Sequence, residues 1–207
     1  MQKMARLPKL SATLSRIPEG GALRRIVAIA PAPVLPGENE PHYITMAERI
    51  IEETQPKDSI EEFLIRDVLD LTWEILRVRR LKTGVLRASL GSGVRMVLDE
   101  IGHGSPHAFG YNEGLGERWA AGNKSARREV DAALRKARLT IDELLAKTAE
   151  EKIDVLERLD RMLASAEVRR NNALREIGRH REALGAAIRA AINEVEVVEF
   201  REVDSGH

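Results

Sequence analysis

The sequence contains no cysteine, so disulfide bonds, thiolate metal sites and cysteine nucleophiles are excluded. Aromatic residues make up only 3% of the 207 residues, so any core must be built mainly from Leu, Ile, Val and Ala, which suits packing of helix against helix. No run of 18 apolar residues occurs, so we expect no membrane span and a cytoplasmic protein.

The chain also lacks an excess of charge of either sign. It has 33 basic and 33 acidic residues, so the net charge gives no argument for or against a nucleic-acid partner. The charged share of 32%, with abundant Ala, Leu, Glu and Arg, is typical of long helices flanked by solvent. We therefore predict an all-α fold: a helical core, a long C-terminal coiled-coil helix and an extended, proline-rich N-terminal arm.

Residues 1–38 form the predicted arm. A long helix cannot pass through so many prolines, and we expect extended chain that either lacks fixed structure or lies along a partner surface. A short strand over Arg25–Ala30 is an alternative for part of this segment. The prolines at this end of the chain are Pro8, Pro18, Pro31, Pro33, Pro36 and Pro41.

Residues 39–101 are predicted to be helical. Asn39 can cap a first helix, with Pro41 in its first turn. Ser59 and Glu62 have the spacing of a capping box, which opens a second helix running to about Leu90. Gly84 and Gly91 mark possible breaks in it.

The remainder of the chain divides into a loop, a helical region and a tail. Residues 102–122 are rich in glycine and are predicted to form a loop. Residues 123–193 are predicted to contain a helix from Asn123 to about Arg138, followed by one long helix that opens with a capping box at Thr140 and Glu143. Residues 194–207 form a tail, in which a short strand is an alternative.

The long helix carries a heptad pattern of apolar residues over about six heptads, which favours a coiled coil over a lone surface helix. Cations interrupt the seam at Lys152, Arg170 and His180. We predict that the coiled-coil seam includes Leu156, Leu159, Leu163, Ile177 and Leu184.

Charge is distributed unevenly along this helix. Ile141–Asp160 has seven acidic and three basic residues, which gives −4, and Arg161–Ala190 has seven arginines and three glutamates, which gives +4. An antiparallel arrangement places unlike charges together. We therefore predict antiparallel pairing, either with a second copy of the chain or with the protein's own earlier helices.

The basic segment 169–181 has two interpretations. Its arginines can contact nucleic-acid phosphates, or they can form a solvated helix face that pairs with an acidic helix, and the interspersed glutamates favour the second interpretation. The candidate contact residues for nucleic acid or for a partner are Arg169, Arg170, Arg175, Arg179 and Arg181.

An enzyme built on the 102–122 loop is a third alternative. His103 and His107, with Glu113 nearby, are the available metal-ligand types there, but Gly104 and Pro106 oppose the helix that would bring the two histidines together. The sequence has no HExxH motif and no phosphate-binding Gly-Lys-Ser/Thr motif. We therefore predict no catalytic residue, no metal site and no cofactor.

Several short words of the sequence resemble those of a family of uncharacterised bacterial helical proteins that has no established activity. The resemblance covers about residues 36–185. It includes Pro36-Gly37-Glu38, Arg66-Asp67-Val68, Trp73-Glu74, Arg77-Val78-Arg79-Arg80, Trp119-Ala120-Ala121-Gly122, Leu159-Asp160-Arg161-Met162-Leu163 and Ala166-Glu167-Val168-Arg169-Arg170. The resemblance implies a helical core and no particular activity. We therefore expect a coiled-coil interaction or scaffolding protein that binds a second copy or another helical protein. The alternative is a nucleic-acid-associated accessory protein, related to mobile elements, that uses segment 169–181.

Overall fold

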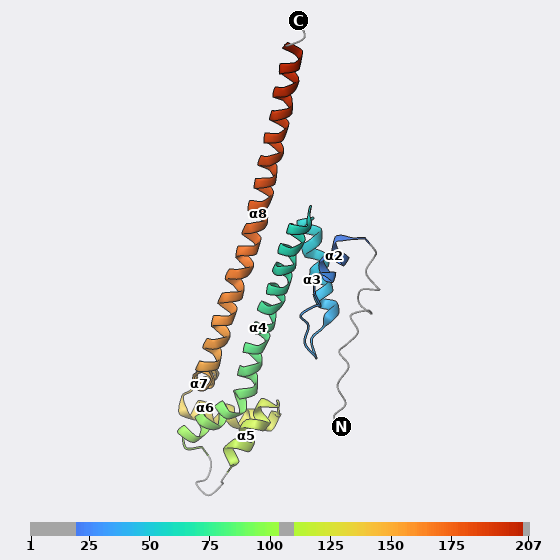
Figure 1. Ribbon diagram of the computed structural model, residues 1–207. Coiled ribbons are helices and arrows are strands. Elements are labelled where there is room, and N and C mark those ends of the chain that lie inside the picture. The colour runs from blue at the N-terminus through green and yellow to red at the C-terminus, as the bar shows by residue number, and fades with distance from the viewer. Residues whose placement is uncertain (1–19, 104–109, 205–207) are drawn as a thin grey trace, which may run out of the picture. The chain divides into compact units, whose positions relative to one another are not determined.

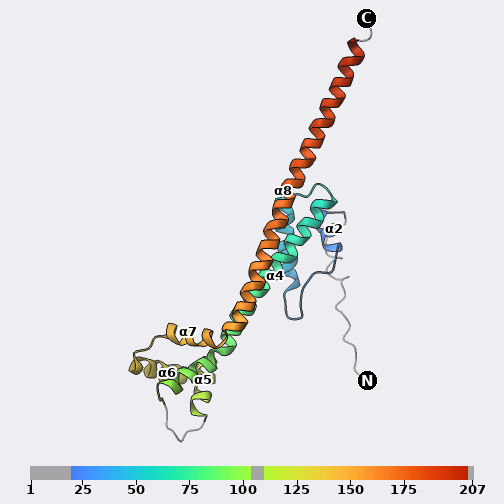
Figure 2. The ribbon, with the colours of Figure 1, turned by 60° about the vertical axis from the view of Figure 1, so that its left-hand side comes forward.

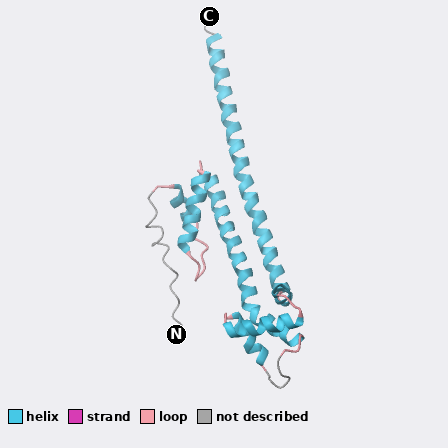
Figure 3. Ribbon diagram, turned by 180° about the vertical axis from the view of Figure 1, so that it is seen from behind, coloured by secondary structure: helices cyan, strands magenta, loops and turns pink. Residues whose placement is uncertain are grey.

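The computed structural model describes residues 20–103 and 110–204. Every regular element in these residues is a helix, with no strand among them (Figure 3), which confirms the predicted all-α fold. No helix in these residues has an apolar stretch sufficient to cross a membrane. Figure 1 labels the helices: α2 (Ala22–Ala28), α3 (Glu40–Thr54), α4 (Ser59–Glu100), α5 (Tyr111–Ala120), α6 (Lys124–Ala137), α7 (Ile141–Glu151) and α8 (Ile153–Asp204).

The chain divides into two compact units, and both boundaries fall inside long helices. Unit 1 comprises residues 1–74 and 166–207, and unit 2 comprises residues 75–165. Unit 1 thus holds α2, α3, the first part of α4 and most of α8, while unit 2 holds the rest of α4, α5, α6, α7 and the beginning of α8.

The core of unit 1 forms where α2, α3 and α8 pack on the first turns of α4. The two views in Figures 1 and 2 both show α8 lying alongside this part of α4. Two of the few aromatic rings, Tyr43 and Trp73, meet edge to face at 5.6 Å between ring centroids. The buried apolar residues are Ile26, Ala47, Ile65, Val68, Leu69 and Ile177.

One buried cation, Arg66, holds the C-terminal end of α2. Its guanidinium also pairs with Asp70 at 2.9 Å. A helix end leaves carbonyl groups without partners, and a guanidinium with five N–H donors can satisfy several of them at once. The possible strand over Arg25–Ala30 is therefore wrong, because the segment is helical through Ala28 and its carbonyls bind this side chain. The backbone carbonyl oxygens that accept from Arg66, at 2.8 to 3.3 Å, belong to Ile26, Val27, Ala30 and Pro31.

Two of the three predicted helix N-caps are confirmed, and one is wrong. Asn39 caps α3 and Thr140 forms a capping box with Glu143, as predicted. Helix α4, however, is not capped by Ser59. The Asp58 carboxylate accepts from the Glu61 backbone N–H at 2.9 Å, because an aspartate is an equally good cap and lies one residue earlier.

The core of unit 2 is a separate apolar cluster, built from α4, α5, α6 and α7. The helix α4 continues to Glu100, ten residues beyond the expected end at Leu90. The buried residues of this cluster are Val94, Val97, Leu98, Leu115, Ala126, Val130, Ala133, Leu134 and Leu144.

Three glycines of unit 2 allow helices to approach closely. A Cβ at Gly116 on α5 would lie 2.3 Å from the Gly91 carbonyl oxygen of α4, and a Cβ at Gly93 would lie 1.9 Å from Oγ1 of Thr148 on α7. Glycine in a helix interior weakens the helix by about 1 kcal/mol, and here the close packing compensates for that cost. Gly91 is therefore not a break in α4.

The predicted loop over residues 102–122 is wrong for half of its length. Residues 104–109 lie outside the described residues, but Tyr111–Ala120 form α5. The glycines in this segment indicated a loop, whereas Gly116 lies where α5 passes the backbone of α4. The buried side chain of Leu115 holds the helix in the unit 2 core.

The predicted continuous helix from Thr140 to about Asn193 is interrupted at Lys152, whose backbone leaves the helical region at φ −110° and ψ 13°. Helix α7 ends there because its own face, with Leu144 and Thr148, is buried in the unit 2 core. The possible strand in the tail is also wrong, because α8 is helical through Asp204. The predicted N-terminal arm lies outside the described residues up to residue 19, and its described part is not extended throughout, because Ala22–Ala28 form α2.

Candidate functional site

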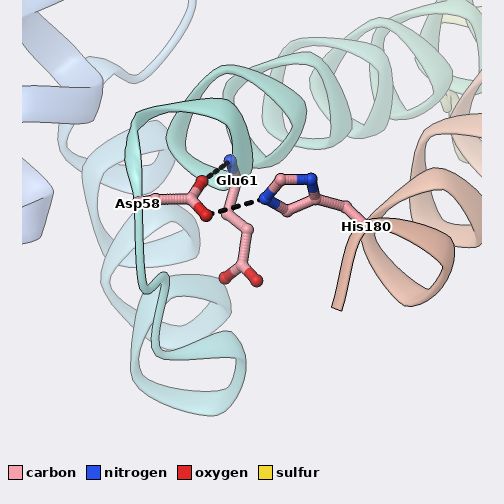
Figure 4. A group of neighbouring side chains, drawn as sticks. All are labelled: Asp58, Glu61 and His180. Carbon is pink, nitrogen blue, oxygen red and sulfur yellow. Dashed lines mark hydrogen bonds and ion pairs between the residues drawn. The ribbon is translucent and has the colours of Figure 1, made fainter. Parts of the chain in front are cut away.

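Four charged side chains of unit 1 gather where α8 passes the beginning of α4. Asp58 precedes α4 and Glu61 lies in its first turn, while His180 and Arg181 are neighbours on α8. Figure 4 shows the Asp58 carboxylate between the Glu61 backbone nitrogen and the His180 ring. Its Oδ2 lies 2.7 Å from His180 Nε2. We call these four residues the α4–α8 clasp.

The Glu61 carboxylate is the most enclosed part of the clasp, with a side chain that is 0% exposed. Arg181 donates from Nε to one of its oxygens at 2.8 Å and from Nη2 to the other at 2.9 Å. The backbone N–H of Lys57 donates to Oε2 at 2.9 Å. Arg181 Nη2 also donates to the carbonyl of Thr54 at 2.6 Å, so one guanidinium joins α8 both to α4 and to the end of α3.

The clasp shifts the acidity of its members. The Arg181 hydrogen bonds lower the pKa of Glu61, although burial acts in the opposite direction. The backbone N–H of Glu61, followed by the His180 ring, lowers the pKa of Asp58. The hydrogen bond to Glu61 raises the pKa of Arg181. Both carboxylates are therefore held in their charged form.

The side chains of Asp58, Glu61 and His180 are also potential metal ligands. One ligand atom from each lies within 4.8 Å of the others, and this is the one such group among the residues that the structure describes. Each carboxylate oxygen of the group already accepts from a protein donor. The Arg181 cation beside Glu61 would repel a metal ion, so the arrangement suits an ion-pair contact between helices better than metal binding.

The predicted basic contact residues do not act as one group. Arg181 belongs to the clasp, while Arg170 occupies a half-buried seam position where its Nε has no hydrogen-bond partner among the described residues. Arg175 bonds to Asn172 on the same helix. The other two arginines are exposed: Arg179 pairs with Glu176 at 3.3 Å, and Arg169 lies at a groove.

The predicted seam agrees in register with the covered face of α8 along most of its length. Leu156 lies in unit 2 and Ile177 in unit 1, and both are buried, while Leu159 and Leu163 are half-buried. Leu184 continues the same register but is 42% exposed. The seam therefore passes beyond the last clasp residue without cover.

A groove of about 510 Å³ runs along unit 1 between α4 and α8. Leu64, Leu71 and Ala173 supply apolar surface, and the exposed side chains of Ile60 and Phe63 belong to the turn of α4 just before Leu64. The polar residues that line the groove are Asp67, Asp70, Glu74, Arg169, Asn172 and Glu176. Acidic side chains thus outnumber the basic one.

Of the candidate ligand types noted in the 102–122 region, His103 and Glu113 lie within the described residues. His103 Nε2 lies 3.4 Å from Glu129 of α6, and the Tyr111 hydroxyl donates to the same carboxylate. This hydrogen bond raises the pKa of Tyr111. His107 lies outside the described residues.

Sequence reasoning identified Arg181 but not its partners in the clasp. The sequence pattern there indicated a capping box of Ser59 and Glu62 and gave no role to Asp58 or Glu61. The charge difference between the halves of the C-terminal region indicated that the basic stretch meets an acidic helix, but several helices carry acidic residues. Comparison of the chain with protein-family models, with curated proteins and with solved structures found no match.

Proposed function

We propose that this chain is a helical interaction or scaffolding protein, and that it pairs with a second copy of itself through the part of α8 beyond Arg181. The observation that supports this is an uncovered apolar stripe at helical spacing. Leu184, Ile188 and Ile192 are 42%, 52% and 51% exposed, and they follow the seam that α4 covers earlier on α8. A continued but unpartnered seam indicates a contact with another helix.

The pairing should be antiparallel. Helices α3 and α4 pack against α8 up to the clasp and leave the following turns bare. In a parallel pair the two copies of these helices would compete for the same space beside the stripe. In an antiparallel pair centred near Ile188, Leu184 of each copy meets Ile192 of the other. The helices α3 and α4 of the two copies then lie at opposite ends of the pair.

The molar mass of the full chain in solution tests the proposal. A dimer is expected for the native chain and a monomer for the variant Leu184→Ser, Ile188→Ser, Ile192→Ser. The matched control is Met162→Ser, Val168→Ser, Leu174→Ser, which removes three exposed apolar side chains from earlier positions on α8. Loss of the dimer in both variants, or in neither, contradicts the proposed contact.

A nucleic-acid function remains the second candidate because Arg169, Arg175 and Arg179 are exposed on α8. Arg181 is engaged with Glu61, so it would not contribute. Salt-sensitive binding to duplex DNA that is lost with Arg169→Gln, Arg175→Gln and Arg179→Gln supports this alternative. Absence of binding at low salt excludes it.

A further inference from the structure

The helix α6 of unit 2 carries a group of exposed cations. Segment 124–138, which comprises α6 and the residue after it, has six basic and two acidic residues, which gives +4. All six basic residues are exposed, and none of them forms an ion pair within the described part of the chain. The buried side of the helix, with Val130 and Leu134, packs into the unit 2 core. The six basic residues are Lys124, Arg127, Arg128, Arg135, Lys136 and Arg138.

The two acidic residues of the segment neutralise this charge only in part. The Glu129 carboxylate is engaged away from the cations, because its Oε1 lies 3.4 Å from His103 Nε2 and accepts from the Tyr111 hydroxyl. Asp131 is then the one acidic residue of the segment that is exposed. The exposed side of α6 therefore keeps an excess of positive charge that an anionic ligand would neutralise.

The helix itself does not explain where three of these cations lie. Lys124, Arg127 and Arg128 fall at the beginning of α6, and its first turn contains no acidic residue. The helix dipole is positive at that end, so it disfavours cations there and favours anions. The dipole does account for Arg135 and Lys136, which lie in the last turn. The cations at the beginning of α6 thus add to a positive helix end, which indicates an anion from outside the chain.

Three of the cations form a row along the helix. Lys124, Arg128 and Arg135 are four and seven residues apart, so their directions from the helix axis agree to within about 40°. The row spans about 16 Å along the axis. One strand of a nucleic-acid duplex offers a phosphate about every 3.4 Å along its axis. A row of this length can therefore contact several phosphates of one backbone.

The other side chains on α6 favour a duplex backbone over a protein or a single strand. A contact between proteins buries large apolar side chains at its centre, and no large hydrophobic residue of α6 is exposed. Its exposed residues besides the cations are Ser125, Asp131 and Ala132. Binding of single strands relies on bases that stack on aromatic side chains, and α6 contains no aromatic residue. A surface of cations without apolar or aromatic side chains suits the phosphates of a duplex.

We propose that α6 binds the phosphate backbone of double-stranded nucleic acid through the row of Lys124, Arg128 and Arg135. The neighbouring cations of the helix increase the attraction. This site is separate from the α8 arginines considered above, and it does not depend on the proposed pairing of α8.

Binding of the full chain to a DNA duplex of about 20 base pairs, measured by fluorescence anisotropy over a range of salt concentrations, tests the proposal. The variant Lys124→Gln, Arg128→Gln, Arg135→Gln should bind roughly tenfold or more weakly at low salt. The slope of log binding constant against log salt concentration should become smaller by about 3, because three phosphate contacts are lost. The variant Lys124→Arg, Arg128→Lys, Arg135→Lys keeps the charges and should bind like the native chain. Weak binding by this second variant overturns the proposal.

The matched control is Arg169→Gln, Arg175→Gln, Arg179→Gln, which removes the same charge from exposed positions of α8 and should bind like the native chain. Equal effects of the α6 and α8 variants overturn the proposal, as does a native chain that does not bind the duplex at low salt. Binding to single-stranded DNA as tight as to the duplex also overturns it. Competition by polyglutamate as strong as by duplex would indicate an acidic protein partner instead, with the same consequence. The molar mass of the α6 variant should equal that of the native chain, so failure of the self-pairing proposal is seen separately.

Discussion

Arg181 donates to both carboxylate oxygens of Glu61, at 2.8 and 2.9 Å, although 120 residues separate the two along the chain. Glu61 has no exposed surface, so its charge depends on this partner. A buried carboxylate that loses its cation is strongly destabilising, whereas a pair on the surface contributes little. The contact therefore fixes where α8 crosses the beginning of α4.

Replacing Arg181 tests the energetic role of the clasp. Arg181→Met should lower the free energy of unfolding by about 2 kcal/mol, because it leaves the Glu61 carboxylate buried without a cation. The measurement is chemical denaturation followed by circular dichroism. The control Arg179→Met removes an exposed pair on the same helix and should change stability by less than about 0.5 kcal/mol. Similar losses in both variants would contradict the role of the clasp.

The clasp also predicts that the stability of the folded protein depends on pH. The pKa of Glu61 and of Asp58 is lower in the folded protein than the ordinary values of 4.5 and 3.8. Their contribution to stability is therefore complete above about pH 5 and is lost as the pH falls through the lower folded-state pKa values. Denaturation midpoints of the native chain should fall between pH 5 and pH 3, and Glu61→Gln should show a smaller fall. Glu117→Gln, at an exposed position of unit 2, should behave like the native chain, and an unchanged slope in Glu61→Gln would oppose the assignment.

Two glycines of α4 should respond in opposite directions to the same substitution. Gly93→Ala should destabilise the protein by about 1 to 3 kcal/mol, because the added methyl group would overlap Thr148. Gly84→Ala should stabilise it by about 0.5 to 1 kcal/mol, because nothing lies within 4 Å and alanine favours the helix. Thermal unfolding of the two variants measures the difference. Stabilisation by both would mean that α7 does not approach α4 at Gly93.

Arg66 should be among the most sensitive positions of unit 1. Arg66→Met keeps much of the packing but leaves the carbonyl oxygens at the end of α2 without this donor, and it removes the cation that pairs with Asp70. We expect a loss of about 3 kcal/mol, together with faster amide exchange in α2. Arg49→Met, at an exposed position of α3, is the control and should leave both quantities unchanged.

The helical class of the fold was predictable because its signals are local. The low aromatic share and the high charged share are typical of helices flanked by solvent. The Asn39 cap and the capping box of Thr140 with Glu143 each join residues within one helical turn. The heptad register on α8 was likewise readable, and it coincides with the covered face up to Ile177.

The misassigned segments depend on contacts between residues far apart in the sequence. Gly116 lies in a glycine-rich stretch, which indicates a loop. In the structure it instead allows α5 to pass close to Gly91 of α4. The end of α2 depends on Arg66, about 40 residues later. The clasp was missed for the same reason, since no local pattern identifies Glu61 as the partner of Arg181.

Cross-linking within the free part of α8 tests the proposed self-pairing most directly, because the chain has no cysteine of its own. Two single-cysteine proteins, Leu184→Cys and Ile192→Cys, would be oxidised separately and as a mixture. An antiparallel pair centred near Ile188 predicts that the mixture forms covalent dimers faster than either protein alone. Faster linking of each protein to itself would indicate parallel helices, and no covalent dimer in any sample would contradict the pairing altogether.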